Sequence, residues 1–192
     1  MCNEYRSYVD IDAIREEFSH VKIRIEFPEA VPNLEPRDSI RITDVAPIIR
    51  CGAPGAGELV QRRWSWPGPR GAPVFNFRSD GRAFERGRCL VIADGFYEFT
   101  PNPGSKLKTK WLFTLADADW FCIAGLWRTA EDVGEAFTML TTAPGADIKP
   151  YHDRQVVVLE RKDWARWLDH AVPARELARP LPAGALNVKQ VA

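Results

Sequence analysis

Cysteine at the second position is the residue of this chain with the most distinctive potential chemistry. Because a small side chain after the initiator generally allows Met1 to be removed during synthesis, the sequence predicts a Cys2 that carries a free α-amine beside its thiol. An α-amine with a pKa of about 7.7–8.0 can condense with an aldehyde, and the thiol can then close onto the imine as a five-membered thiazolidine. Ring closure is intramolecular, so it holds an aldehyde far better than an imine does. The plainer interpretation is that Cys2 belongs to a flexible terminus.

Four polar residues elsewhere in the chain can assist such chemistry by moving protons and holding the terminus. Glu98 lies between aromatic residues of a predicted strand, a setting that raises the pKa of a carboxyl group. His152 stands in a proline-containing loop before an apolar strand and titrates near neutral pH. Asn76 and Arg78 share one strand face by two-residue alternation, so both can point into one pocket. Each residue also has a plainer interpretation, as a solvated strand residue or a loop hydrogen-bonding group.

An arginine-rich segment extends from Gln61 to Arg88, with seven arginines against two acidic residues. The whole chain has 26 basic and 26 acidic residues, so the rest of it is acidic by five charges. The neutral total argues against a broadly basic DNA-coating surface, whereas this segment predicts a local basic face. Aromatic residues lie among the arginines, a mixture suited to phosphate contacts and base stacking in single-stranded nucleic acid. A strand with polar outer and aromatic inner positions has the same composition, and the segment alone favours that interpretation.

The composition excludes several classes of protein. With 192 residues, 45% of them hydrophobic, the chain can enclose one packed core and is not disordered. Its longest apolar runs, Phe121–Trp127 and Val156–Leu159, are far shorter than the about 20 residues of a membrane span. The four cysteines form no closely spaced pair, so we expect no metal and no other cofactor. The polar N-terminus lacks the apolar core of a signal peptide, which predicts a cytoplasmic protein.

The elements that must position these residues are mainly strands. Asp10 precedes apolar residues at helical spacing, which predicts a helix over 10–18, and the proline-rich stretch Pro28–Arg41 predicts a connecting loop. Short runs rich in Val, Ile, Phe and Trp, separated by Pro, Gly and Asp, predict strands. The expected strands are 46–51, 58–65, 73–78, 88–93, 96–100, 110–116, 120–126, 136–142 and 155–159, followed by helices at 160–169 and 173–179.

This pattern predicts an α+β fold in which residues 1–192 form a single domain. We expect a curled, largely antiparallel β-sheet or barrel with a few short helices, and a monomer.

Eight sequence blocks connect these positions into one ordered pattern. They are Met1-Cys2, Asp44–Pro47, Asn76–Asp80, Arg88–Phe99, Ala124–Trp127, Phe137–Thr142, His152–Arg154 and Asn187–Lys189. In this order, and with Cys2 at the start, they resemble the SRAP family (SOS response-associated peptidase), whose members form abasic-site DNA–protein crosslinks. The resemblance covers nearly the whole chain and implies a predominantly β fold with a positively charged cleft for single-stranded DNA.

The resemblance also implies a role for each chemical residue. Cys2 would form the thiazolidine with the ring-opened aldehyde of an abasic site, and Asn76 would position the N-terminal residue. Glu98 would act as the acid and base for sugar ring opening and for crosslink reversal. His152 would transfer protons and stabilise the flanking oxygen or phosphate, while Arg78 would hold a phosphate.

Further DNA contacts follow from the same resemblance, with single-stranded DNA containing abasic sites as the implied partner. The residues concerned are Pro47, Arg62, Arg63, Trp66 and Arg154. The family is also linked to removal of its own leading peptide, which accounts for the peptidase in its name. The protein would therefore be cytoplasmic and associated with the nucleoid when bound to damaged DNA.

The chain departs from the family pattern at several positions. Asn3-Glu4 replaces the usual Gly-Arg after the cysteine, and Arg6 stands nearby as a basic residue that can compensate. Phe77 stands where a small residue is common, and Asp80 where Glu is typical. Gln155-Val156 replaces the usual Met-Pro. These changes affect the expected contacts to DNA more than the expected chemistry at Cys2.

Two other function classes stay open at this point. A cysteine peptidase or amidase would use Cys2 as an N-terminal nucleophile and His152 as its base, and would turn over peptide or amide bonds in trans. A non-catalytic binder of single-stranded DNA would keep salt-sensitive binding after Cys2 is removed.

Overall fold

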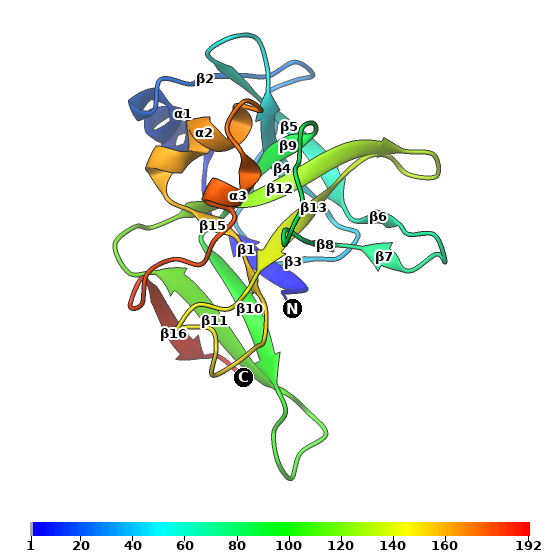
Figure 1. The fold of residues 1–192 in the computed structure, drawn as a ribbon, viewed down its shortest axis with the longest axis vertical. Coiled ribbons are helices and arrows are strands. Elements are labelled where there is room, and N and C mark those ends of the chain that lie inside the picture. The colour runs from blue at the N-terminus through cyan, green and yellow to red at the C-terminus, as the bar shows by residue number, and fades with distance from the viewer. Residues whose placement is uncertain (1) are drawn as a thin grey trace.

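A five-stranded barrel forms the centre of the computed structural model, which describes residues 2–192 (Figure 1). Neighbouring strands are antiparallel in the order β13-β12-β9-β4-β5, and a parallel pairing of β5 with β13 closes the barrel at Phe137 and Trp64. The barrel strands are β4 (Val45–Cys51), β5 (Ala56–Trp64), β9 (Arg88–Ala93), β12 (Phe121–Ala130) and β13 (Gly134–Thr142). Met1, whose removal the sequence predicts, lies outside the described residues.

A second sheet, of five strands, continues from the barrel. Its order is β16-β11-β10-β1-β3, and β9 passes through Asp94 directly into β10. The strands are β1 (Glu4–Ser7), β3 (Arg37–Arg41), β10 (Gly95–Thr100), β11 (Thr109–Leu115) and β16 (Leu186–Gln190). Strand β1 therefore lies between β10 and β3, which fixes the chain that follows Cys2.

Short elements complete the structure around the barrel. The helices are α1 (Ile11–His20), α2 (Trp164–Leu168) after a 3-10 turn (Arg161–Asp163), and α3 (Ala174–Leu177). The short strands are β2 (Arg24–Glu26), β6 (Trp66–Pro67), β7 (Pro73–Val74), β8 (Asn76–Arg78), β14 (Gln155–Val156) and β15 (Val158–Leu159). Strand β8 runs parallel to β13, with Asn76 opposite Met139.

Two apolar layers explain why the barrel strands are buried on both faces. Inward-pointing residues such as Val91 share one cluster with Cys2 and Tyr5, while outward-pointing residues such as Ile92 pack under the helices. Helix α1 begins where the sequence predicts, because the Asp10 carboxylate accepts the backbone N–H of Ala13 at 2.8 Å. The α+β fold with a curled, largely antiparallel sheet and a few short helices is therefore confirmed.

The expected connection Pro28–Arg41 is wrong over its last part, since Arg37–Arg41 forms β3. Ile40 is the only buried residue of that strand, so its sequence carries no strand periodicity, and pairing with β1 creates the element. Strands β1 and β16 are also missing from the expected set. Leu186 is the only buried residue of β16, and β1 buries the polar Glu4 and Ser7 beside Tyr5, so neither strand shows an alternating apolar pattern. The expected strand 73–78 is split into β7 and β8, and the helix expected at 160–169 begins as a 3-10 turn.

Candidate functional site

Cys2 is buried in the structure rather than displayed on a flexible end. Its side chain is 1% exposed and packs in the inner apolar cluster, where the thiol donates to the backbone oxygen of Glu4 at 3.3 Å. Burial, reinforced by the nearby Glu98 carboxylate, raises the pKa of the Cys2 thiol well above its usual range. The thiol is therefore neutral at pH 7, and a reaction at sulfur needs a group that removes its proton.

Asn76 and Glu98 hold the two backbone ends of Cys2. The Asn76 side-chain amide donates to the carbonyl oxygen of Cys2 at 2.7 Å, and the Glu98 carboxylate accepts the Cys2 backbone N–H. Asn76 is fixed because β8 is paired with β13, and the N–H of Met139 donates to the oxygen of Phe75 at 3.1 Å. The nitrogen that Glu98 contacts is the atom that becomes the α-amine once Met1 is absent.

Glu98 lies on the inner face of β10 and is 1% exposed. Burial raises the pKa of this carboxyl group to about 7, although the contact with the Cys2 N–H opposes the shift. At neutral pH both the acid and the carboxylate are therefore populated. Such a group can donate a proton in one step and accept one in the next.

A tightly bonded loop places His152 near Glu98. The backbone N–H of His152 donates to the oxygen of Ile148 at 3.0 Å, and the Tyr151 ring packs on Trp111 with 4.8 Å between centroids. The charge of Asp153 in this loop also contributes to the raised pKa of Glu98. The loop is thus an ordered neighbour of Glu98 and Cys2.

The imidazole of His152 is neutral at pH 7. Burial lowers its pKa, so Nδ1 accepts the backbone N–H of Arg154 at 3.0 Å. The Asp153 carboxylate is 2.8 Å from the same nitrogen and would accept a hydrogen bond from it only if Nδ1 carried a proton. With Nδ1 accepting from Arg154, the neutral ring carries its proton on Nε2, which is then a donor.

Arg78 and Arg154 form a basic pair beside Thr141. Arg78 is exposed and stands opposite Thr141 in the β8–β13 pairing. The Arg154 guanidinium donates to the Thr141 carbonyl at 2.9 Å and pairs with the Asp80 carboxylate at 2.6 Å. Two guanidinium groups at adjacent positions are suited to one phosphate, which would compete with the Asp80 carboxylate for Arg154.

The other residues expected to contact DNA do not lie beside Cys2. Arg62 pairs with Glu135 at 2.6 Å and with Glu29 at 2.5 Å, so its charge is compensated within the fold. Arg63 donates to the carbonyl of Thr43 at 3.3 Å. The remaining two are buried: Pro47 lies on β4 on the face opposite Ala46, and Trp66 lies beside Phe77 in a separate groove.

Glu4 and Gln155, which depart from the family pattern, have structural partners. The Glu4 carboxylate accepts from Lys110 Nζ at 2.8 Å and from Ser39 Oγ at 2.7 Å. The Gln155 side-chain oxygen accepts the backbone N–H of Gly145 at 2.5 Å and so anchors the loop that carries His152. Sequence reasoning missed Lys110 because its partner is 106 residues away.

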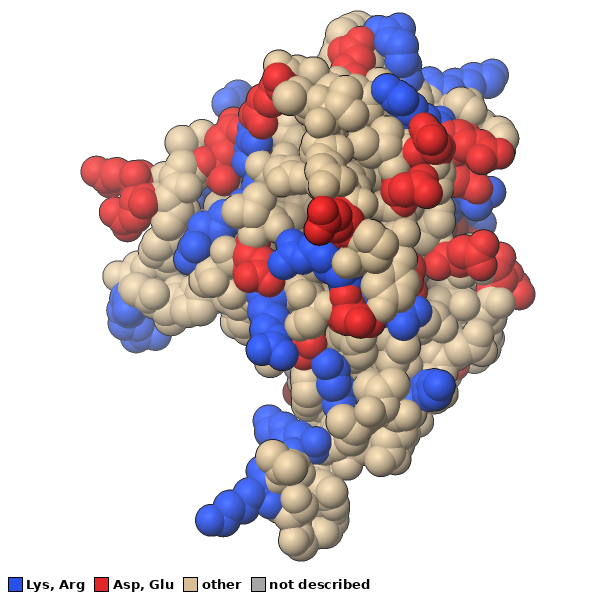
Figure 2. Space-filling model, turned by 180° about the vertical axis from the view of Figure 1, so that it is seen from behind, with Lys and Arg blue, Asp and Glu red and all other residues tan. Residues whose placement is uncertain are grey.

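Arg6 is used within the fold, with its Nε 3.2 Å from the Asp94 carboxylate. It therefore does not supply a second basic group beside Cys2 in place of the expected arginine. Basic side chains occur instead on the projecting tip between β10 and β11, which carries Lys106 and Lys108. On the face seen in Figure 2 this tip has no acidic neighbours.

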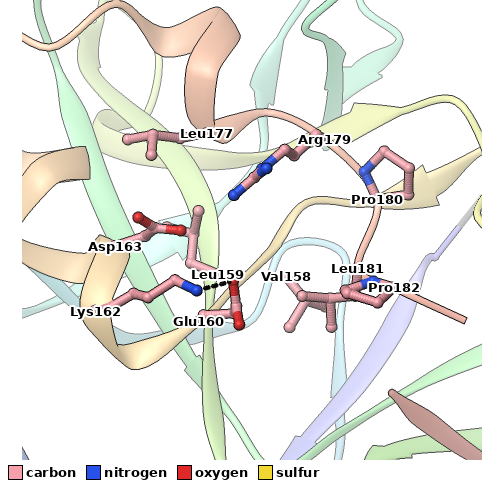
Figure 3. Close-up of a pocket in the computed structure, with 10 residues that line it drawn as sticks. All are labelled: Val158, Leu159, Glu160, Lys162, Asp163, Leu177, Arg179, Pro180, Leu181 and Pro182. Atoms are coloured by element: carbon pink, nitrogen blue, oxygen red, sulfur yellow. Dashed lines mark ion pairs between the residues drawn. The ribbon is translucent and has the colours of Figure 1, made fainter. Parts of the chain in front are cut away.

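A pocket of about 360 Å³ lies away from these residues, between Val158–Asp163 and Leu177–Pro182 (Figure 3). Lys162 and Glu160 pair in it at 2.9 Å, and the Arg179 guanidinium points into the same space. None of the residues predicted to carry chemistry lines it. Within residues 2–192 no group of three or more His, Cys, Asp and Glu is placed to hold a metal, and no helix suits a membrane crossing in length and apolarity.

Comparison with known proteins shows the same combination of fold and sequence. The family described as SOS response associated peptidase (SRAP) matches residues 1–192. Among curated proteins, the abasic site processing protein YoqW of Bacillus subtilis is 32% identical over 87 residues, which are 43% of this chain and 38% of YoqW. The abasic site processing protein YoaM of the same organism is 34% identical over 86 residues, 43% of this chain and 37% of YoaM. The match thus spans less than two fifths of either relative.

Solved structures share the fold at low sequence identity. A crystal structure of a protein from Bordetella bronchiseptica superposes with a TM-score of 0.75 at 23% identity, covering 100% of both chains. One from Bacteroides thetaiotaomicron gives 0.76 at 15% identity, covering 100% of this chain and 92% of the other. Because the family match extends over the whole sequence and the fold agrees, this chain belongs to the SRAP family.

Proposed function

We propose that this protein captures abasic sites in single-stranded DNA as a covalent thiazolidine through Cys2, once Met1 has been removed. The observation that carries the proposal is that Glu98, with a pKa of about 7, contacts the nitrogen of Cys2. Removal of Met1 would leave a primary amine in the same place, beside a thiol and an acid–base group. The names of the curated relatives support abasic DNA as the substrate.

The proposed reaction begins with the sugar. Protonated Glu98 gives its proton to the ring oxygen of the closed sugar while the C1′ hydroxyl gives its proton to water, which opens the ring to the aldehyde. The neutral α-amine of Cys2 adds to the aldehyde carbon, and one of its protons moves to the oxygen to give a carbinolamine. The second N–H proton passes through the Glu98 carboxylate to the hydroxyl group, which leaves as water. The product of this stage is an imine.

Ring closure follows at the same carbon. The Cys2 thiol transfers its proton to the Glu98 carboxylate, sulfur bonds to the imine carbon, and Glu98 passes the proton on to the nitrogen. The net change is aldehyde plus aminothiol to thiazolidine plus water. The same groups acting in reverse would release the DNA, and the proposal includes this self-reversal.

We also propose that Arg78 and Arg154 hold the phosphates next to the lesion. Arg78 is exposed, and among the described residues the Arg154 guanidinium is held by Thr141 and by an exposed Asp80 carboxylate that a phosphate can replace. Contacts to DNA by Arg62 would require its ion pairs to open, so we assign it a lesser part. The reaction would take place in the cytoplasm, at the nucleoid, with the protein acting as a monomer.

The first experiment is to mix the protein with a single-stranded oligonucleotide that contains one abasic site and to separate the products on a denaturing gel. A slowly migrating band is expected from the wild-type protein and none from Cys2→Ala. Cys2→Ser is the matched control, because it keeps a small second residue and the amine but lacks the thiol; it should give only a band that disappears unless the imine is reduced. Intact mass shows whether Met1 is absent.

Two results would contradict the proposal. One is the absence of a stable band with protein that lacks Met1, and the other is a stable band that survives Cys2→Ala. Turnover of a peptide or amide in trans that depends on Cys2 would support the N-terminal nucleophile instead. The neutral thiol argues against that alternative, because a cysteine peptidase begins its reaction with a thiolate.

A further inference from the structure

A groove of about 510 Å³ lies between β6, β8, the loop after β8 and the far part of β12 (Figure 1). Phe77 lines it, whereas Asn76 and Arg78 alternate onto the other face of β8 and belong to the Cys2 site. The groove is therefore distinct from the site of the proposed reaction. Its lining includes the aromatic side chains of Trp66, Phe77 and Trp127 and the guanidinium groups of Arg82, Arg86 and Arg128.

The wall of this groove is held in place by backbone contacts. Gly87 has a φ of +71°, and a Cβ at this position would come within 2.4 Å of the Trp127 carbonyl oxygen. The Trp127 N–H donates to the Gly87 oxygen at 2.7 Å, which fixes the loop against β12. The neighbouring Arg88 is buried and donates to the oxygen of Phe84 at 2.6 Å. The groove is thus formed before any ligand binds.

The chemistry of the lining suits an anion attached to a flat ring. The Arg128 guanidinium lies over the Trp66 ring at 4.4 Å, and that of Arg82 over the Phe77 ring at 4.8 Å. Stacked guanidinium groups keep their N–H edges for a phosphate. Among residues 2–192, no carboxylate lines the groove or pairs with Arg82, Arg86 or Arg128. The positive charge is therefore available to a partner.

We propose that this groove binds a nucleotide of the single strand that flanks the lesion, with its base on the outer face of a ring-stacked guanidinium group and its phosphate on the N–H edges of the arginines. This inference rests on the proposed function for the identity of the strand. Arg82 follows Arg78 by four residues, and the edge of β8 away from β13 pairs with no described strand, so a chain can pass over it. A flexible single strand can make that turn, whereas a duplex is too stiff.

The test measures the affinity of the full chain for a fluorescent single-stranded oligothymidylate of about 15 nucleotides that has no abasic site. The double variant Arg86→Ala/Arg128→Ala should bind about 10-fold more weakly, and its logarithmic salt dependence should be shallower by about 1.4, two phosphate contacts. Arg175→Ala, an exposed arginine on α3, is the control and should match the wild-type protein. A thermal unfolding midpoint for each variant verifies the fold.

The outcomes separate this inference from the proposed function. Unchanged affinity and salt dependence in a folded double variant would overturn the proposal that the groove binds a nucleotide, even if the wild-type protein crosslinks abasic DNA. Weakened binding by the double variant would support it, even if no crosslink forms. Displacement of the oligothymidylate by an acidic peptide at similar concentration would overturn the assignment to a nucleotide, because it would show a site for charge alone.

Discussion

At the scale of single residues, the reactive position is defined by contacts to the backbone of Cys2 rather than to its side chain. Asn76 holds the carbonyl oxygen and Glu98 the nitrogen, so the sulfur and the future amine are fixed relative to one acid–base group. A terminus held at both ends of its residue loses little freedom on reaction. In the proposed reaction, that order would favour ring closure over release of the imine.

Glu98 should control both the pH dependence of capture and that of folding. Folding raises its pKa to about 7, so its ionisation costs stability as pH rises from the unfolded pKa of about 4.3 through 7. Glu98→Gln should therefore be more stable than the wild-type protein at pH 8, by on the order of 3 kcal/mol, and nearly equal at pH 4.5. Urea unfolding at both pH values measures the difference.

The same substitution should slow crosslinking about 100-fold or more, because glutamine transfers no proton. In the wild-type protein the crosslinking rate should fall above pH 7, as the acid form of Glu98 disappears. A rate that stays constant from pH 6 to pH 9 would contradict the role of Glu98 in ring opening. Gel quantification over time supplies the rates.

Asp80 should weaken the binding of DNA by occupying Arg154. The two side chains are 2.6 Å apart, and the hydrogen bond from Arg154 lowers the pKa of Asp80, so the carboxylate stays charged at neutral pH. Asp80→Asn should bind single-stranded DNA several-fold more tightly, measured by fluorescence anisotropy. Asp12→Asn, on the exposed surface of α1, is the matched control. Equal affinities for the two variants would exclude this competition.

At the scale of elements, Glu4 connects β1 to the adjacent strand β3 and, across β10, to β11. Its carboxylate reaches Lys110 on β11 across the Tyr97 ring, which lies 3.9 Å from Lys110 Nζ, and it also accepts from Ser39 on β3. Strand β1 follows Cys2 directly, so these contacts help to keep Cys2 opposite Glu98. An acidic residue after the cysteine is thus compatible with an intact site.

A double-mutant cycle of Glu4→Gln and Lys110→Gln should give a coupling energy of about 1–2 kcal/mol. Burial alone would raise the pKa of Glu4, but the hydrogen bonds from Lys110 and Ser39 outweigh it and lower the pKa. The pair therefore stabilises the fold above the unfolded pKa of about 4.3 and is lost as pH falls through the folded pKa. A coupling energy near zero at pH 7 would show that the pair is only a surface contact.

Arg88 connects the loop after β8, which lines the groove, to the segment that follows α2. It is 2% exposed, donates to the backbone oxygens of Phe84 and Val172, and stacks over Trp167. Arg88→Met would leave these oxygens without donors, so the free energy of unfolding should fall by about 2–4 kcal/mol. Arg86→Met, at an exposed neighbour, should change it by less than about 0.5 kcal/mol. Equal effects in urea unfolding would contradict the structural role of Arg88.

At the scale of the whole molecule, Trp64 joins the barrel to the second sheet. It is fully buried, stacks with Phe137 of the barrel, makes an edge contact with Tyr5 of β1, and donates to the oxygen of Phe75 at 2.9 Å. Because both sheets share this cluster, we propose that residues 1–192 unfold as one domain. Trp64→Phe should lower the free energy of unfolding by about 1–3 kcal/mol.

Far-UV circular dichroism and tryptophan fluorescence should report one coincident transition in wild-type protein and in Trp64→Phe. Two separated transitions would mean that the sheets fold independently. Single cooperative unfolding would also mean that loss of the site and loss of the barrel cannot be separated by heat or urea.

The charge distribution is also a property of the whole molecule. The sequence has a basic excess in residues 61–88, and in the structure those arginines have different partners and different exposure. Arg62 is neutralised by Glu29 and Glu135, and Arg88 serves backbone oxygens. Arg78, Arg82 and Arg86 are exposed and carry no ion pair within the described residues. Charge composition therefore overstates the basic surface, because it does not show which charges the fold itself uses.

The sequence by itself determined those helices and strands whose own apolar residues recur with the period of the element. The capped helix after Asp10 and the apolar strands such as 88–93 follow from local periodicity, as does the α+β class. It also led to the prediction that Cys2, Asn76, Glu98 and His152 act as one chemical set, because their residue types suit aldehyde capture and the ordered blocks resemble a family.

Only the tertiary structure shows which contacts these residues make. That Asn76 and Glu98 hold the backbone of Cys2, that Lys110 balances Glu4, and that Ile40 belongs to a strand all depend on partners far along the chain. A local pattern reports the burial of its own side chains and nothing about such partners. Edge strands, ion pairs and pKa shifts therefore become visible only in the folded structure, because they depend on residues that are distant in the sequence.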